Sequence, residues 1–210
     1  MEPDITMTKH EEINGFRIIR GHLDPEQQAV MVETVRDVIR TAPLVRPVTA
    51  WGKPMSVRMS SAGRVGWVID RGRYRYADRH PETNAPWPAI PPEILGVWQA
   101  VSGWADAPDS CLINWYAEGT RMGLHQDKDE DAFDAPVVSI SLGCPARFRM
   151  GGVDRKDPTC STILESGDVV VMGGEARLAY HGVDKVLTDG FPHPLTGHGR
   201  INLTLRVVRP

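Results

Sequence analysis

The sequence predicts a single domain of the α+β class that is mainly β, and two observations support this. From Cys111 onward, apolar runs of strand length alternate with Gly, Pro and Asp, whereas the chain before that point carries two helix-like apolar stripes. Short strands at this spacing are typical of antiparallel sandwiches and barrels. The 210 residues suit one domain that buries its own core. We therefore expect a flexible tail over 1–15 and one domain over 16–210, with helices and hairpins over 16–110 and a β-rich core over 111–210.

Two amphipathic helices are expected in the N-terminal half. The first should begin after Asp24, because Asp24 can cap it, Pro25 suits the first helical position and Gln27 completes a capping box. Its apolar stripe stops before Pro43, which disfavours helix in the residue that precedes it. The second helix is expected at about 92–104. The side chains expected to face the core are Met31, Val32, Val35, Val38 and Ile39 in the first helix and Ile94, Leu95, Trp98 and Val101 in the second.

The segment between the helices, residues 43–92, is rich in Gly, Pro, Arg and aromatic residues, which predicts hairpins and loops. Within it, residues 58–79 carry six arginines against two acids, and Trp67, Tyr74 and Tyr76 lie among them. Basic and aromatic side chains mixed in this way suit a surface that holds phosphates and stacks bases. The alternative is a solvated arginine face over a few core aromatics.

Strand-length runs follow in the C-terminal half, and turn-forming residues separate them. Neither a repeat of fixed period nor a low-complexity segment interrupts them. They predict an antiparallel sandwich or barrel rather than a doubly wound parallel sheet. The expected strands lie within residues 111–116, 135–143, 146–152, 161–165, 168–174, 177–182 and 200–208.

Composition and charge argue against several classes of protein. No apolar run is long enough to span a bilayer, and the polar, acidic N-terminus is unlike a secretory or transit peptide. The three cysteines lie far apart and form no CxxC pair, which argues against a disulfide framework or a thiolate zinc site. A net charge of −3 argues against coating of nucleic acid by bulk electrostatics. We expect a cytoplasmic monomer with no membrane partner.

One histidine and one carboxylate in the second half have the spacing of a metal site. His125 and Asp127 lie two residues apart, so on a strand their side chains would leave from the same face. His181 is the best third ligand, because it ends a strand-like run and precedes a glycine. Two histidines and one carboxylate leave coordination positions open, as in non-haem Fe(II) oxygenases, although catalytic zinc sites use the same ligand types. A surface histidine beside a solvated aspartate would give the same spacing.

A second pattern, near the C-terminus, favours iron over zinc. In the run 200–206, polar side chains alternate with aliphatic ones, as on a strand with one polar face. The polar face would consist of Arg200, Asn202, Thr204 and Arg206. Two buried arginines need an anion between them, and 2-oxoglutarate offers a guanidinium-matching carboxylate at each end. Asn114 and Tyr116, also two apart, could add donors, and the sequence leaves open which arginine binds which carboxylate.

Three segments together resemble the AlkB family of Fe(II)- and 2-oxoglutarate-dependent dioxygenases, and closely its bacterial members. They are CLINWYAEGTRMGLHQDKDE at 111–130, GDVVVMGGEARLAYHG at 167–182 and RINLTLR at 200–206. The resemblance extends from about Phe16 to Val208. It implies a double-stranded β-helix, or jelly roll, preceded by helices and by a nucleotide-recognition lid, which GRVGWVIDRGRYRY would form here.

The resemblance also implies roles for individual residues. The Fe(II) ligands would be His125, Asp127 and His181. The residues that hold 2-oxoglutarate would be Asn114, Tyr116, Arg200, Asn202 and Arg206. The substrate side would consist of Met59, Trp67, Tyr74, Asp129 and Arg155, with a flipped base between Trp67 and His125 and with Tyr74 at the nucleic-acid backbone. Met172 departs from the expected pattern, because close bacterial relatives should have tryptophan there, and methionine can fill such a gap adaptably.

The activity that the resemblance implies is oxidative dealkylation of N-alkylated nucleobases such as 1-methyladenine and 3-methylcytosine. The substrate would be DNA, most readily single-stranded, with RNA as a further candidate. Fe(II) would be the metal cofactor, and dioxygen and 2-oxoglutarate would be consumed. Formaldehyde, succinate and carbon dioxide would be released. Three alternatives are a dioxygenase of RNA or protein, a non-catalytic lesion-binding module and a zinc hydrolase.

Charges outside these motifs are interpreted as ordinary ones. Lesions of the 1-methyladenine type are cationic, so Asp129 near the pocket is expected to favour them over normal bases. The acids that follow it, Glu130 and Asp131, are interpreted as part of a solvated charged loop. The remaining histidines are interpreted as surface or loop residues, namely His10, His22, His80, His193 and His198.

Overall fold

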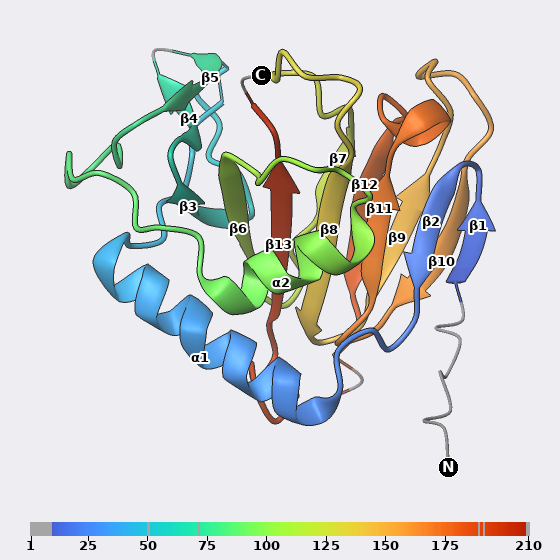
Figure 1. The fold of residues 1–210 in the computed structure, drawn as a ribbon, viewed down its shortest axis with the longest axis horizontal. Helices are drawn as coiled ribbons and strands as arrows, with labels where there is room; N and C mark the ends of the chain where they lie inside the picture. The colour runs from blue at the N-terminus through green and yellow to red at the C-terminus, as the bar shows by residue number, and fades with distance from the viewer. Residues whose placement is uncertain (1–9, 50, 71, 189, 191, 209–210) are drawn as a thin grey trace.

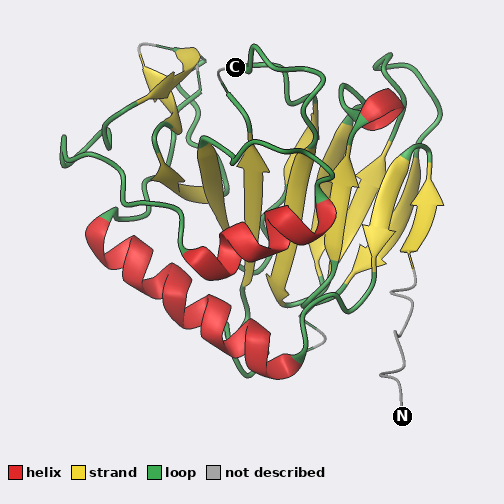
Figure 2. Ribbon diagram, viewed as in Figure 1, coloured by secondary structure: helices red, strands yellow, loops and turns green. Residues whose placement is uncertain are grey.

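The computed structural model describes residues 10–208 except residues 50, 71, 189 and 191. Two β-sheets form the body of the molecule, and two helices cover the outer face of the larger sheet (Figures 1 and 2). None of the described helices is long and apolar enough to cross a bilayer. The elements in chain order are β1 His10–Ile13, β2 Phe16–Ile19, α1 Pro25–Thr41, β3 Arg58–Gly63, β4 Gly66–Asp70, β5 Arg73–Ala77, α2 Pro92–Val101, β6 Ser110–Tyr116, β7 Met122–His125, β8 Val137–Gly143, β9 Ala146–Met150, β10 Cys160–Leu164, β11 Val169–Met172, the 3-10 helix η1 Gly174–Ala176, β12 His181–Val186 and β13 Arg200–Arg206.

The sheet topology is that of a jelly roll, as the resemblance implied, and it agrees with the antiparallel sandwich or barrel that the strand pattern predicted. The larger sheet has seven strands in the order β1-β2-β11-β8-β13-β6-β3, and the smaller has four in the order β10-β9-β12-β7. All of these neighbours pair antiparallel. The strands β4 and β5 form a separate hairpin beyond the end of the larger sheet (Figure 1). This hairpin is the segment expected to serve as the lid.

Helix α1 forms where the sequence predicted it. The carboxylate of Asp24 accepts a hydrogen bond from the Gln27 backbone N–H at 2.9 Å, and the Gln27 side chain accepts one from the Asp24 N–H at 2.9 Å. The helix ends at Thr41, before Pro43. Helix α2 is shorter than expected and ends at Val101 rather than residue 104, because Gly103 takes a left-handed φ of +68°.

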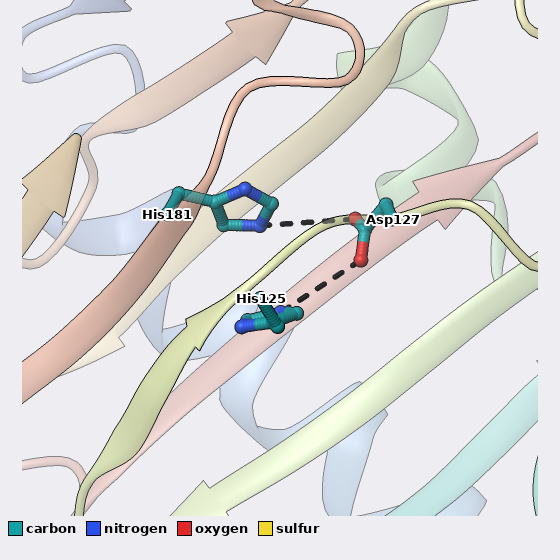
Figure 3. A group of neighbouring side chains, drawn as sticks. All are labelled: His125, Asp127 and His181. Carbon is teal, nitrogen blue, oxygen red and sulfur yellow. Dashed lines mark ion pairs between the residues drawn. The ribbon is translucent and has the colours of Figure 1, made fainter. Parts of the chain in front are cut away.

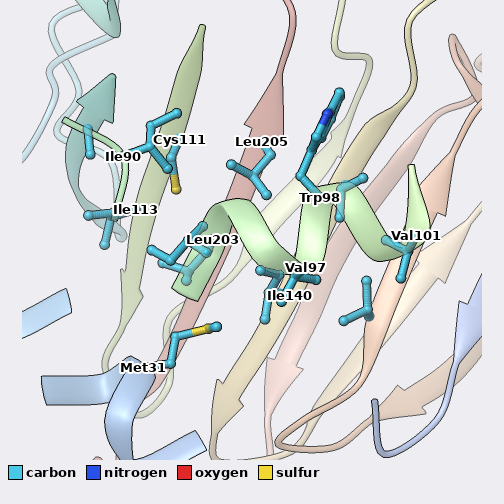
Figure 4. Close-up of a cluster of buried hydrophobic side chains, with 14 of the residues drawn as sticks. Met31, Ile90, Val97, Trp98, Val101, Cys111, Ile113, Ile140, Leu203 and Leu205 are labelled. Atoms are coloured by element: carbon cyan, nitrogen blue, oxygen red, sulfur yellow. The ribbon is translucent and has the colours of Figure 1, made fainter. Parts of the chain in front are cut away.

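The larger sheet is buried on both faces. On its outer face, the helices contribute Met31, Val97 and Trp98, which pack against Ile140 of β8 and Leu203 of β13 (Figure 4). On its inner face, a second cluster fills the space between the two sheets and includes Phe16, Leu112, Phe148 and Leu164. Strand β8 accordingly has every residue buried, which is why its sequence reads as a nearly continuous apolar run.

Three expectations about the elements need correction. His10–Ile13 pair in register with β2, so these residues do not belong to the flexible tail expected over 1–15, and residues 1–9 lie outside the described part. The strands β2 and β3 belong to the larger sheet, so residue 110 does not separate the core from what precedes it. The run 177–182 is a strand only from His181, because η1 and a buried Arg177 precede it.

The histidines outside the metal motif lie in loops or on the surface, with one feature that the sequence did not indicate. His80 lies in a loop but is buried, and its ring packs against Trp87 with the centroids 5.1 Å apart. Its Nε2 lies 2.8 Å from the Pro43 carbonyl oxygen, and its Nδ1 accepts hydrogen bonds from the backbone N–H groups of Glu82 and Thr83. This imidazole therefore ties the hairpin region to the end of α1.

Candidate active site

Two histidines and one aspartate meet where β7 and β12 pair. His125 ends β7, His181 begins β12, and the two residues are register partners. Asp127 lies beyond the end of β7 rather than on the strand, but its carboxylate still faces both rings (Figure 3). The Asp127 oxygens lie 3.8 Å from His125 Nε2 and 3.9 Å from His181 Nε2. One potential ligand atom from each residue lies within 4.8 Å of the others, which suits one divalent ion.

The backbone orients both imidazoles for metal binding. His125 Nδ1 lies 2.9 Å from the Gly123 carbonyl oxygen, and His181 Nδ1 lies 3.0 Å from the Ala179 carbonyl oxygen. A carbonyl can only accept, so Nδ1 carries the proton in each ring. The Nε2 lone pairs are therefore directed toward Asp127, where a metal would use them.

The charges of His181 and Asp127 also suit a metal. Burial lowers the pKa of His181 to about 4, and His125 adds to this effect, so His181 is neutral near pH 7. Burial alone would raise the pKa of Asp127, but Arg206 and the two histidines outweigh it and hold that pKa well below its usual range. A neutral imidazole and an ionised carboxylate are the forms that coordinate metal ions.

Strand β13 presents its polar face to this site, as predicted. Arg206 donates from Nη2 and Nε to the Asp127 carboxylate at 2.8 and 3.2 Å, and its Nε lies 3.4 Å from Glu130 Oε1. Arg200, at the other end of the strand, donates to neutral oxygens, including Ser141 Oγ at 2.6 Å. Burial lowers the pKa of Arg200 to about 10. Arg206 therefore already has carboxylate partners, whereas the hydrogen-bond partners of Arg200 in the described chain are all neutral.

Some buried polar atoms here have no hydrogen-bond partner among the described residues. They include Arg200 Nε, Arg206 Nη1 and Asn114 Oδ1. All three residues line the cavity that contains the metal motif. Two guanidinium groups with spare donors, one near each end of β13, fit a ligand with a carboxylate at each end. The residues present therefore fit 2-oxoglutarate.

All side chains predicted from the sequence to bind metal, cosubstrate or substrate line one cavity of about 420 Å³. The residues expected at the substrate side line this cavity together with the metal motif. Trp67 Nε1 donates to Asp129 Oδ2 at 2.9 Å, and the Trp67 ring stacks on Tyr74 with centroids 5.3 Å apart and planes at 15°. Met59 is buried in β3, whereas Arg155 is exposed and lies over the Tyr180 ring at 5.6 Å.

Sequence reasoning missed a buried charge network behind the metal motif. Glu130 was interpreted as solvated, but only 4% of it is exposed. It accepts hydrogen bonds from the Tyr76 hydroxyl and from Arg177 Nη2, the latter at 3.1 Å. Arg177 also donates to the Ala135 and Asp127 carbonyl oxygens at 2.8 and 2.7 Å. Glu130 is buried because it offsets the charges of two buried arginines, Arg177 and Arg206.

The position that departs from the expected family pattern is well packed. Met172 ends β11, is 2% exposed and belongs to the cluster between the two sheets. It also lines the cavity of the metal motif. Methionine thus fills this part of the wall between Phe16 and Val137, its register partners on the flanking strands.

Comparison with known proteins agrees with this geometry. Residues 15–206 match the model of the 2OG-Fe(II) oxygenase superfamily. The chain is 52% identical over 197 residues to the alpha-ketoglutarate-dependent dioxygenase AlkB homolog of Caulobacter vibrioides, with 94% of this chain and 89% of that protein covered. It is 47% identical over 180 residues to the alpha-ketoglutarate-dependent dioxygenase AlkB of Escherichia coli, with coverage of 84% and 82%. The solved structure of OsALKBH1 matches with a TM-score of 0.76 at 29% identity and coverage of 94% and 99%. The chain therefore belongs to the AlkB family of dioxygenases, whose members use Fe(II), 2-oxoglutarate and dioxygen.

Proposed function

We propose that the chain removes alkyl groups from N-alkylated nucleobases of the 1-methyladenine and 3-methylcytosine type by oxidising the alkyl carbon. The observation that carries this proposal is a single cavity lined by the metal motif, the arginines with spare donors and the Trp67–Tyr74 pair. The first two features suit the Fe(II) and 2-oxoglutarate of the family. The aromatic pair offers a flat face on which a base can stack.

His125, Asp127 and His181 would hold the Fe(II) through the two Nε2 atoms and the carboxylate. The metal, together with 2-oxoglutarate and dioxygen, supplies the oxidation of a C–H bond, and 2-oxoglutarate leaves as succinate and carbon dioxide. The chain's own residues then have three tasks. They bind the cosubstrate, orient the base and keep other groups away from the metal.

The arrangement of β13 supports one orientation of 2-oxoglutarate. Arg206 contacts Asp127, so it would hold the carboxylate next to the metal. Arg200 lies at the far end of the strand and would hold the remote carboxylate, where its positive charge has only neutral hydrogen-bond partners in the described chain. Asn202 and its register partner Asn114 lie between them, and Tyr116 is the register partner of Arg200.

The substrate side suits a cationic base. A methyl group on N1 of adenine or N3 of cytosine lies on the Watson–Crick edge, so the base must come from a single strand or leave the duplex. Trp67 would stack on it, and the Asp129 carboxylate beside the indole would favour its positive charge. Met59 would contact the base from β3, and Arg155 and Tyr74, both exposed, would contact the backbone. Hydroxylation of the methyl group gives an N-hydroxymethyl base, which releases formaldehyde and the repaired base.

We further propose single-stranded DNA as the preferred substrate, a monomeric state and a cytoplasmic location. A single strand avoids the cost of unpairing the target base. The large exposed apolar side chains of the described surface come from separate parts of the sequence, among them Val30, Phe133, Val153 and Ile163, which supports a monomer. Cys111 and Cys160 carry free thiols, which suits a reducing compartment.

The test of the function is product release from single-stranded oligonucleotides that carry 1-methyladenine or 3-methylcytosine, with Fe(II), ascorbate and 2-oxoglutarate. We expect formaldehyde and succinate in equal amounts from the wild type and neither from His125→Ala. The rates of formaldehyde release from matched duplex and RNA oligonucleotides then show which nucleic acid is preferred. Succinate without base repair would contradict the nucleobase assignment and favour a protein substrate, whereas lesion binding without either product would favour a binding module.

A further inference from the structure

We propose that the turn carrying Trp51, together with a second cavity beside the active site, forms a subsite for the nucleotide next to the target base. This inference rests on the proposed function, because it concerns how the nucleic acid is held beyond the flipped base. The second cavity has a volume of about 470 Å³ and shares Thr49, Met59 and Trp67 with the first. A strand that places one base in the first cavity therefore has its next residue close to the second.

The second cavity suits a flat, mostly apolar group with a polar edge. It lies between the loop before β3 and the β4–β5 hairpin. Its apolar lining is provided by Val45, Pro47, Val48, Val68, Ile69 and Trp87. Arg46 and Glu82 supply one positive and one negative group at the same cavity. A nucleobase combines an apolar face with hydrogen-bonding edges and is attached to a phosphate, which Arg46 could contact.

Hydrogen bonds join the described residues on either side of Trp51. The Thr49 N–H donates to the Lys53 carbonyl oxygen at 2.9 Å, and the Gly52 N–H donates to the Thr49 carbonyl oxygen at 2.9 Å. The Thr49 hydroxyl also bonds to the Lys53 backbone, and Gly52 takes a left-handed φ of +72°, which favours glycine. Val48 and Pro54 form a β-bridge at the base of the turn. These contacts place the described backbone on both sides of Trp51 next to the second cavity.

The indole itself has no structural task that the described residues show. Trp51 is 87% exposed, and the second cavity is lined by Gly52, which follows it, and by Thr49, two residues before it. No described aromatic ring stacks on it. An exposed tryptophan beside a proposed nucleic-acid site is suited to stacking on a base, an interaction that tolerates any sequence.

Charge around the turn supports a nucleic acid as the occupant. Residues 43–58 contain Arg46, Lys53 and Arg58 and no acidic residue, although the whole chain has a net charge of −3. All three basic side chains are exposed. Cations that flank a stacking ring are the usual means of holding the phosphates on either side of a base.

The proposal is tested by equilibrium binding of methylated oligonucleotides to the iron- and 2-oxoglutarate-loaded enzyme without oxygen, measured by fluorescence anisotropy. One substrate carries normal bases on both sides of the lesion, and the other carries abasic sites there. Trp51→Ala should weaken binding of the first about tenfold and leave binding of the second unchanged. Trp51→Phe should keep most of the affinity. Lys53→Ala should weaken the binding of both substrates equally. It should also reduce the slope of log Kd against log salt concentration by about one, as expected for one lost phosphate contact.

Val30→Ala, which removes an exposed apolar side chain from α1, provides the matched control and should bind both substrates like the wild type. Equal affinity of Trp51→Ala and wild type for the normally flanked substrate would overturn the subsite. Equal weakening on both substrates would also overturn it, because the tryptophan would then act through the shape of the protein. Failure of the proposed function is distinct from both, since the wild type would then release no formaldehyde from either substrate.

Discussion

The two ends of strand β13 carry the same side chain in two different electrostatic settings. Arg206 lies against the carboxylates of Asp127 and Glu130, and its pKa is raised above the ordinary value despite the opposing effect of burial. Arg200 is as deeply buried, but its hydrogen bonds in the described chain go to a hydroxyl and to carbonyl oxygens, and its pKa is lowered to about 10. The first arginine is thus paired with two carboxylates, whereas the second has no carboxylate among its hydrogen-bond partners in the described chain, and we propose that 2-oxoglutarate supplies one. We therefore expect Arg206 to contribute mainly to the stability of the fold and Arg200 mainly to the affinity for 2-oxoglutarate.

The largest expected effect is loss of stability on removal of Arg206. In Arg206→Ala, the carboxylates of Asp127 and Glu130 would stay buried without their guanidinium partner, which should cost about 3–5 kcal/mol of unfolding free energy. Urea denaturation of the metal-free protein measures this. A loss below about 1 kcal/mol would show that the pair contributes little, as is common for solvated ion pairs.

The acid stability of the metal-free protein should report on the same end of the site. His181 has a folded pKa of about 4 against an ordinary 6.5, because it is buried and lies beside His125. The unfolded chain therefore binds this proton first, so unfolding free energy should fall as pH drops from about 6.5 to 4. The loss should be on the order of 3 kcal/mol. Urea denaturation across that range should show it, and His181→Gln should flatten this part of the profile.

Removal of Arg200 should affect the cosubstrate rather than the fold. In Arg200→Met, the KM for 2-oxoglutarate should rise about a hundredfold, because a buried charge-assisted contact to a carboxylate is lost. The unfolding free energy should change less than in Arg206→Ala, since a buried cation without a carboxylate partner is also removed. Steady-state kinetics with varied 2-oxoglutarate, beside denaturation of both variants, makes the comparison. Similar losses of unfolding free energy in the two variants would contradict the proposal that Arg206 serves stability and Arg200 serves cosubstrate binding.

The smallest expected effect concerns the link between the β4–β5 hairpin and this network. Tyr76 of β5 donates to Glu130, and burial raises the Tyr76 pKa well above its usual value, so the hydroxyl remains a donor. Tyr76→Phe should cost about 1–2 kcal/mol of stability and speed amide hydrogen exchange in β4 and β5. The KM for 2-oxoglutarate should not change. A rise in that KM would mean that the hairpin helps to position Arg206.

Local patterns in the sequence were enough to predict much of the fold. The capping box at Asp24, the alternation from Arg200 to Arg206 and the apolar run of β8 each reflect contacts within one element and its period. The side chains proposed for metal and cosubstrate could be identified because their motifs combine unusual residue types at fixed spacing. The structure adds that they line a single cavity.

The features that could not be predicted depend on contacts between distant segments. Glu130 lies in an acidic run that would normally be solvated. Its burial depends on Arg177 and Tyr76, which approach it only in the folded chain. Strand β12 begins at His181 because Arg177 is drawn into hydrogen bonds with loop carbonyls. Likewise, no local pattern shows that β1 pairs with β2 and extends the larger sheet.

The pairing of β7 with β12 has a consequence for proteolytic resistance. Strand β7 is four residues long and lies at the edge of the smaller sheet, with β12 as its neighbour. His125 and His181 are opposite each other on these strands, so an ion bound by both would act as a cross-link at the sheet edge. Removal of metal by a chelator should therefore increase the mobility of β7 and of the residues up to Asp127 first. Proteolytic cleavage should then begin there, while the larger sheet, which the helices cover, stays intact.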